Sequence, residues 1–254
     1  MKKTKVFLLI GLWLLPVAGV FYSCRHKPAE VVLCGTVHGF HRNNPNYSYS
    51  DLFNLIEATN PDIIGVEIRP EDLEGSDSVL NSFYPYEMTE VTRRFSDVKV
   101  VGIDWWSEST VGKTASNELI ENLHQRKLEK HLESDSVIME GMPAILDSLN
   151  RVKMQIAADS SLSSIMHGCY DSLNQRYYKE LGLFLNETPY SGLHDDYMMR
   201  HHKIGDNMVN IVNRHPGKRI VFLTGADHQV FAKKRLLEKC GDRIILNPTV
   251  RESP

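Results

Sequence analysis

Apolar residues along the chain gather in short runs that are hydrophobic on both faces, a pattern typical of fully buried strands. These runs lie at residues 31–34, 62–69, 98–104, 219–224 and 243–246. Segments with apolar residues at helical spacing separate the runs, and Ser50 is placed to cap one such helix that ends before Pro61. Strands that alternate with helices predict the α/β class, with a mostly parallel sheet flanked by helices.

The middle of the chain, residues 107–193, shows no strand pattern. Its apolar residues keep helical spacing, and further helices are expected at 194–214 and 230–240. The sequence therefore predicts an α/β core formed by residues 30–106 and 194–254. A helical insertion, residues 107–193, interrupts this core.

The first segment, residues 1–23, has the parts of a secretory signal peptide. Three early lysines precede an uncharged, mostly apolar run over 6–21, which is shorter than the roughly 20 apolar residues of a membrane-spanning helix. The run leads to Ser23-Cys24, which resembles a bacterial lipoprotein cleavage site with Cys24 as the lipidated residue; an uncleaved amino-terminal anchor is the alternative. Both predict an exported protein of the bacterial cell envelope that is anchored to a membrane and faces the periplasm or the exterior.

Composition and charge exclude two classes of protein. Hydrophobic residues make up 42% of the 254 positions and charged residues 24%, which is the balance of a globular protein and not of a disordered one. The formal net charge is −3, and no basic patch with interleaved aromatic residues occurs, so binding to nucleic acid is not expected. The expected partner is a peptide or a small molecule.

Side chains capable of chemistry follow four of the predicted strands. His38 comes after the first strand, Glu67 lies near the end of the second, Asp104 ends the third and His228 follows the fourth. In open parallel sheets, ligands bind outside the carboxyl ends of the strands. The four side chains are therefore expected at one edge of the sheet.

Glu67 is the most informative of these residues, because an unpaired carboxylate is costly inside a buried strand. Arg69 lies two residues further on, on the same face of an extended strand, and is expected to partner it. One interpretation is a structural ion pair; the other is a carboxylate held in place to bind metal or to activate water. His38 and His228 share a local frame, since each follows a strand and a glycine, as Gly-x-x-His.

The two Gly-x-x-His motifs, the Glu67-x-Arg69 pair and an arginine in a late helix, Arg200, resemble the TraB/PrgY group. That group includes Tiki and GumN-like proteins, with erythromycin esterases and the haem-binding ChaN lipoproteins as distant relatives. The resemblance covers residues 30–104 and 200–246. After Arg200 the chain carries His201-His202, where relatives commonly have Asn or Asp, and we expect these two histidines to be in a supporting shell or on the surface.

The resemblance implies hydrolysis of a peptide or ester by activated water. His38, His228 and Glu67 form a candidate set for a divalent metal of the Mn, Co or Zn class, with Asp104 as a fourth ligand or an orienting group. Without metal, Glu67 or a histidine would act as general base. Arg69 and Arg200 would stabilise the oxyanion or hold a substrate carboxylate.

Two other interpretations stay open at this point. The first is a ChaN-like lipoprotein that binds haem or iron through exposed Tyr or His ligands and does no catalysis. The second is a scaffold whose site residues are merely structural. The cysteines have no metal-ligand spacing, and nothing in the sequence decides whether Cys169 and Cys240 pair.

Overall fold

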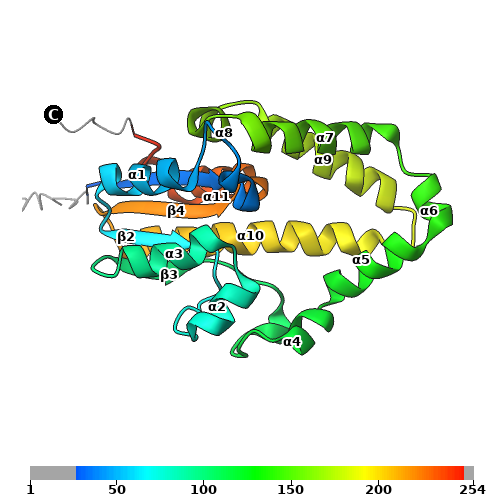
Figure 1. Cartoon of the computed structure of the whole chain (residues 1–254), viewed down its shortest axis with the longest axis horizontal. Helices are drawn as coiled ribbons and strands as arrows, with labels where there is room; N and C mark the ends of the chain where they lie inside the picture. The colour runs from blue at the N-terminus through cyan, green and yellow to red at the C-terminus, as the bar shows by residue number, and fades with distance from the viewer. Residues whose placement is uncertain (1–26, 249–254) are drawn as a thin grey trace, which may run out of the picture.

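The computed structural model describes residues 27–248, which form a five-stranded, all-parallel sheet with helices on both faces (Figure 1). Its strands are β1 (Ala29–Thr36), β2 (Ile63–Val66), β3 (Lys99–Gly102), β4 (Arg219–Gly225) and β5 (Ile244–Leu246). They lie in the order β3-β2-β4-β1-β5. The α/β class and the parallel sheet are therefore confirmed, although β2 and β3 are shorter than the apolar runs that predicted them.

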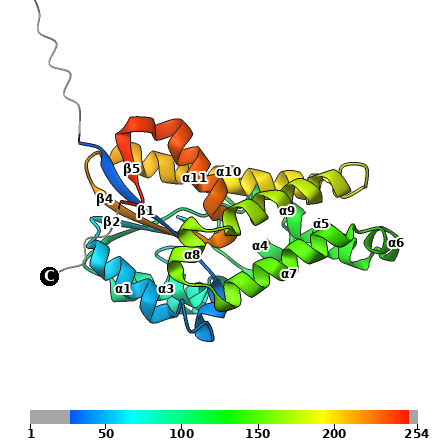
Figure 2. The ribbon, with the colours of Figure 1, turned by 90° about the horizontal axis from the view of Figure 1, so that it is seen from above.

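The alternation of side chains along β1 explains why helices cover both faces of the sheet. Val32 and Cys34 belong to a core shared with α1 (Tyr49–Thr59) and α3 (Tyr86–Arg94). Val31 and Leu33 belong to a second core shared with α10 (Ser191–Arg214) and α11 (Ala226–Cys240). Figure 2 shows α1 and α3 on the side of the sheet opposite to α11.

Every regular element described between β3 and α10 is helical, as the fold prediction required. These elements are η2 (Glu108–Thr110), α4 (Asn117–Glu121), α5 (His124–Ser134), α6 (Ser136–Glu140), α7 (Ala144–Asp159), α8 (Leu162–His167) and α9 (Tyr170–Leu185). The long helices α5, α7 and α9 extend beyond the end of the sheet at which its strands finish (Figure 1). They have a small core of their own, which includes Leu146, Leu181 and Leu185.

Helix α10 joins this third core to the sheet. Near its start, Leu193 packs with the insertion, whereas Ile204 and Met208 pack against the sheet. Its middle therefore passes the carboxyl ends of the strands, and Arg200 and His201 lie on this part of the helix.

Two helix starts differ from the sequence expectation. Ser48, not Ser50, caps α1, because its side chain accepts from the Asp51 amide while the Asp51 carboxylate accepts from the Ser48 amide. Helix α11 begins at Ala226, directly after β4, so that His228 lies in its first turn and not in a loop. The remaining helix, α2 (Asp77–Phe83), and the short turns η1 (His38–Arg42) and η3 (Gly241–Arg243) complete the fold.

Some expectations from the amino-terminal sequence lie outside residues 27–248, namely the signal peptide over residues 1–23 and the lipidated Cys24. Within the described range, none of the helices combines the length and apolar character that crossing a bilayer requires. The three cysteines in this range are free thiols, so Cys169 and Cys240 do not pair.

Candidate active site

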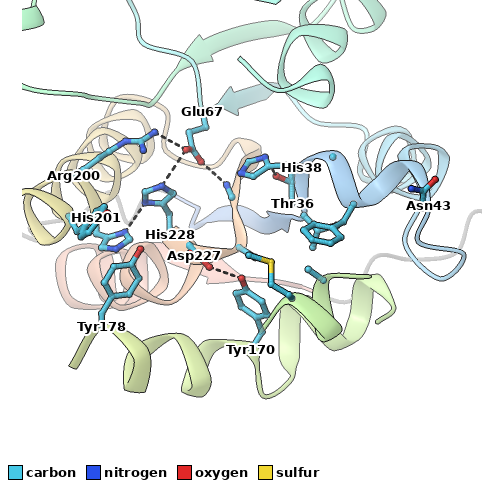
Figure 3. A pocket seen from close by; sticks show the side chains of 18 residues that line it. Thr36, His38, Asn43, Glu67, Tyr170, Tyr178, Arg200, His201, Asp227 and His228 are labelled. Carbon is cyan, nitrogen blue, oxygen red and sulfur yellow. Dashed lines mark hydrogen bonds and ion pairs between the residues drawn. The ribbon is translucent and has the colours of Figure 1, made fainter. Parts of the chain in front are cut away.

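A cavity of about 590 Å³ lies at the carboxyl ends of the strands, between the sheet and the helical insertion. Figure 3 shows that His38, Glu67, Arg200 and His228 approach one another on one side of it. Tyr170 and Tyr178 of α9 form part of the opposite side. The position at the carboxyl ends of the strands is where an open parallel sheet places a ligand.

Glu67 is a carboxylate fixed by four neighbours. Its Oε2 accepts hydrogen bonds from the Thr224 hydroxyl at 2.7 Å and the Gly225 amide at 2.6 Å. Its Oε1 accepts from Arg200 Nη2 at 3.0 Å and faces His228 Nε2 at 3.3 Å. Burial alone would raise the pKa of this carboxyl, but His228, Arg200 and His38 outweigh it and hold the pKa well below the usual range. Glu67 is therefore a permanent negative charge.

Arg69 does not partner Glu67, and this prediction was wrong. The chain turns tightly after β2, where the Ile68 amide donates to the Val66 carbonyl at 2.7 Å, so the extended geometry that would place residues 67 and 69 on one face ends there. The Arg69 guanidinium instead donates to Asp72 at 2.7 Å and to the Thr110 carbonyl at 3.1 Å. Arg69 is not among the residues that line the cavity; it holds the start of the insertion against the sheet.

Arg200, and not Arg69, is the arginine that pairs with Glu67. Besides Glu67, it binds Asp104, with Nε 3.0 Å from Oδ1 and Nη2 3.1 Å from Oδ2. Asp104 also accepts from the Trp106 indole at 2.8 Å. Asp104 therefore fixes Arg200 of α10 at the strand ends.

His38 forms a second histidine–carboxylate pair, with a partner that the sequence analysis did not include. Its Nδ1 lies 2.8 Å from Oε1 of Glu87, a fully buried residue of α3. Since a carboxylate only accepts, the proton of a neutral His38 is assigned to Nδ1, which leaves Nε2 as an acceptor. Burial lowers the pKa of His38, but the hydrogen bond and charge of Glu87, with the charge of Glu67, raise it above its ordinary value.

The backbone around His38 directs its ring towards Glu67. His38 has φ +50°, a left-handed conformation that is uncommon for residues with a side chain. Its Nε2 lies so close to Gly225 that a Cβ there would be 2.7 Å away, and the same Cβ would be 3.6 Å from Glu67 Oε2. Glycine at position 225 is therefore what lets the His38 ring and Glu67 come together (Figure 3).

His228 uses both ring nitrogens within the protein. Its Nε2 faces Glu67, and its Nδ1 lies 2.7 Å from Nδ1 of His201. His201 is 1% exposed and stacks on Phe231, with ring centroids 4.1 Å apart. Burial first, and then the neighbouring His228 and Arg200, lower the pKa of His201 to about 2. His201 is therefore neutral at physiological pH and supports His228, while His202 is exposed.

Asp227 connects this side of the cavity to the insertion. Its Oδ1 accepts from the Tyr170 hydroxyl at 2.6 Å, and its Oδ2 pairs with the buried Lys153 of α7 at 3.0 Å. Its carbonyl accepts from the Asn174 amide group at 2.6 Å. These contacts fix α7 and α9 as the wall that faces the strand ends.

The sequence-derived metal set does not form a ligand cluster in this arrangement. Among residues 27–248, no group of three or more His, Cys, Asp or Glu side chains is placed to hold a metal ion. His228 Nε2 and Glu67 Oε1 face each other, and the Nδ1 of each cavity histidine already has a partner. The residues therefore do not fit the expected metal as they stand, and a Mn, Co or Zn ion stays a prediction.

Comparisons with known proteins do not assign the chain to a family. No protein-family model matches the chain, and neither a curated protein nor a solved structure does. The case for a function therefore depends on the geometry of the site.

Sequence reasoning found His38, Glu67, Asp104, Arg200 and His228, and the structure brings all five to the same edge of the sheet. It did not single out Glu87 or Asp227, and it considered Tyr178 only as one of several tyrosines of the insertion, for which packing was the default and contact with haem or substrate the alternative. Asp227 belongs to the Gly225–His228 motif, so that motif could have indicated it. Glu87 and Tyr178 lie in helices with no distinguishing motif, and only the tertiary packing brings them to the cavity.

Proposed function

We propose that this protein is a hydrolase of carbonyl compounds, such as esters or peptides, in which His38 activates water. The observation that carries the proposal is the Glu87–His38 pair, with Nδ1 held by a buried carboxylate and Nε2 directed towards the cavity. Histidine oriented in this way is a common general base. Within residues 27–248, no hydrogen bond occupies His38 Nε2.

In the proposed reaction, Nε2 of neutral His38 accepts a proton from a water molecule. The water oxygen forms a bond to the carbonyl carbon, and the carbonyl π electrons move to oxygen to give a tetrahedral oxyanion. When this intermediate collapses, the bond from carbon to the leaving group breaks, and the leaving group takes the proton back from His38. Glu87 and Glu67 stabilise the imidazolium that exists between these two transfers, which is also why they raise the pKa of His38.

Glu67 acts in this scheme as a fixed charge and not as the base. Its two oxygens already accept from Thr224, Gly225 and Arg200, and its pKa lies well below the usual range. A carboxylate so strongly stabilised as an anion is a weak proton acceptor. The sequence left open whether Glu67 or a histidine is the general base, and these contacts support His38 in that role.

The experiment measures hydrolysis by the purified full-length chain on a panel of p-nitrophenyl esters, a lactone and an internally quenched peptide. We expect His38→Ala to lower kcat by about 10²–10⁴-fold, the usual contribution of general-base catalysis. His202→Ala is the matched control, because it removes an exposed histidine elsewhere. Wild-type turnover in His38→Ala would contradict the mechanism.

The other sequence predictions can be tested on the same preparation. Metal analysis, and turnover before and after chelation, decides whether a metal is required. A Soret band on addition of haem would favour the ChaN-like alternative over hydrolysis, particularly if the wild-type protein cleaves nothing. Export, lipid attachment at Cys24 and the relation to the TraB/PrgY group stay predictions, and globomycin-sensitive processing of the amino terminus would test the lipid.

A further inference from the structure

Three tyrosines line the cavity, and they differ in what their hydroxyl groups bind. The Tyr170 hydroxyl donates to Asp227 at 2.6 Å, and the Tyr197 hydroxyl donates to Glu129 at 2.7 Å. The Tyr178 hydroxyl makes no hydrogen bond within residues 27–248, and it is not among the fully buried unpaired atoms, so it opens onto the cavity that Tyr178 lines. Buried tyrosines usually find a partner for this group. A donor left unused beside a cavity therefore points to a ligand.

Packing holds the Tyr178 ring firmly. It meets His201 edge-on, with ring centroids 4.7 Å apart, and contacts Tyr197 at 5.8 Å and Phe231 at 5.6 Å. Figure 3 shows Tyr178 beside His201 and Asp227, across the cavity from His38. Burial, followed by the charge of Asp227, raises the pKa of Tyr178 well above its ordinary value, so that the hydroxyl keeps its proton. It is a fixed, neutral hydrogen-bond donor.

The proposed hydrolysis needs such a donor, because both arginines expected to stabilise the oxyanion are bound to carboxylates, and only Arg200 keeps a nitrogen, Nη1, without a partner among the described residues at the cavity. Arg69 lies outside the cavity and binds Asp72. Arg200 directs Nε and Nη2 at Asp104 and Glu67. Developing charge on a carbonyl oxygen must nevertheless be stabilised by an oriented donor.

We propose that Tyr178 is a catalytic residue that donates a hydrogen bond to the substrate carbonyl oxygen and stabilises the oxyanion formed when water attacks. This inference rests on the proposed function, and it also defines the substrate class. A single neutral donor suits an acyl group, whose transition state places charge on one oxygen. A transferring phosphoryl group spreads its charge over several oxygens and is normally met by cations. The substrate is therefore an ester, lactone or amide and not a phosphate ester.

The first measurement compares the kinetics of Tyr178→Phe and Tyr177→Phe. Both variants remove one hydroxyl from neighbouring positions of α9, but Tyr177 does not line the cavity. We expect Tyr178→Phe to lower kcat by about 10²-fold, the effect of removing one oxyanion donor, with KM and melting temperature near those of the wild type. Tyr177→Phe should behave as the wild type. A kcat for Tyr178→Phe within about threefold of the wild type would overturn the inference.

The second measurement does not depend on turnover. A trifluoromethyl ketone exists in water as its hydrate, which mimics the tetrahedral intermediate, whereas the matching methyl ketone does not. Calorimetric titration should show that the wild type prefers the fluorinated ketone and that Tyr178→Phe loses this preference. If the wild type cleaves nothing but keeps a preference that depends on Tyr178, the hydrolase proposal fails and the donor role stands. Equal affinity of the wild type for the two ketones would overturn the donor role.

Discussion

The two histidine–carboxylate pairs at the strand ends differ in what surrounds them. His38 pairs with Glu87 through Nδ1, its side chain is 44% exposed, and its Nε2 is directed towards the cavity. His228 pairs with Glu67 through Nε2, is nearly buried, and directs its other nitrogen at His201. The first pair can exchange a proton with a bound molecule, whereas the second is enclosed by the protein. In the proposed mechanism, two similar sequence motifs, both Gly-x-x-His, therefore have different roles: one histidine takes part in the reaction and the other supports the site.

The largest expected difference is between His38→Ala and His228→Ala. The first should lower kcat/KM by about 10³-fold because it removes the proposed general base, with a smaller loss of stability than the second, because only the buried Glu87 loses a hydrogen-bond partner. The second should lower the unfolding free energy by about 2 kcal/mol, because the buried Glu67 and His201 would each lose the contact that His228 makes with them. Kinetics and chemical denaturation of both variants check this. Equal losses of stability would remove the distinction between the pairs.

The charge of Glu67 is the next point to test. Glu67→Gln keeps the shape but removes the anion that Arg200 and His228 face, so we expect a loss of about 3 kcal/mol in unfolding free energy. Glu57→Gln is the control, because Glu57 is exposed and its ion pair with Arg94 lies on the surface; it should change stability by less than about 0.5 kcal/mol. Denaturant titrations at neutral pH measure both, and a wild-type midpoint for Glu67→Gln would contradict the expectation.

His201, which supports the second pair, and His38, in the first, should make stability depend on pH in opposite directions. His201 has a folded pKa of about 2, below its unfolded value, so its contribution is complete above pH 6.5 and is lost as the pH falls. His201→Gln should therefore reduce the acid sensitivity of stability by about 1.4 kcal/mol per pH unit below pH 6. His38 has a raised folded pKa, so the stability that it adds is present below pH 6.5 and is lost as the pH rises through the folded pKa.

Denaturant titrations at several pH values between pH 4 and pH 8 measure how the unfolding free energy changes with pH and so test both directions. His202→Gln is the matched control for His201, because the neighbouring histidine is exposed. An acid sensitivity that is unchanged in His201→Gln would show that this histidine takes up a proton in the folded protein.

Glu87→Gln gives the smallest expected effect. Without the Glu87 charge, the pKa of His38 falls, so the rise of kcat/KM with pH should move to lower pH. The plateau at high pH should fall about tenfold, because a weaker base accepts the proton less readily and the ring loses its orienting partner. Glu90→Gln on the same helix should leave the profile unchanged. An unshifted profile in Glu87→Gln would separate Glu87 from the chemistry.

Much of the fold and part of the site follow from local sequence features. Buried strands that end in glycine predicted the parallel sheet, and parallel strands bring their ends together, so His38, Glu67, Asp104 and His228 were expected to meet. Arg69 was misplaced because a single tight turn after Val66 changes the direction of its side chain, and the alternation rule does not anticipate such a turn.

Glu87 and Tyr178 could not have been found in the same way. Each lies on a helix, and the spacing of apolar residues along a helix indicates only which of its faces is buried. Which buried residue faces a histidine or a cavity depends on how that helix crosses the sheet. That crossing is fixed by the packing of distant segments and not by neighbouring residues.

The direction of β1 has a consequence for how the molecule would be presented at a surface. This strand begins at Ala29, at the end of the sheet away from the cavity, and its carboxyl end leads to His38, which lines the cavity. A tether attached on the amino-terminal side of β1 would therefore hold the molecule by its base, with the cavity and the insertion pointing outward. Such an orientation would leave the entrance open to solutes in the surrounding medium and turned away from the lipids underneath.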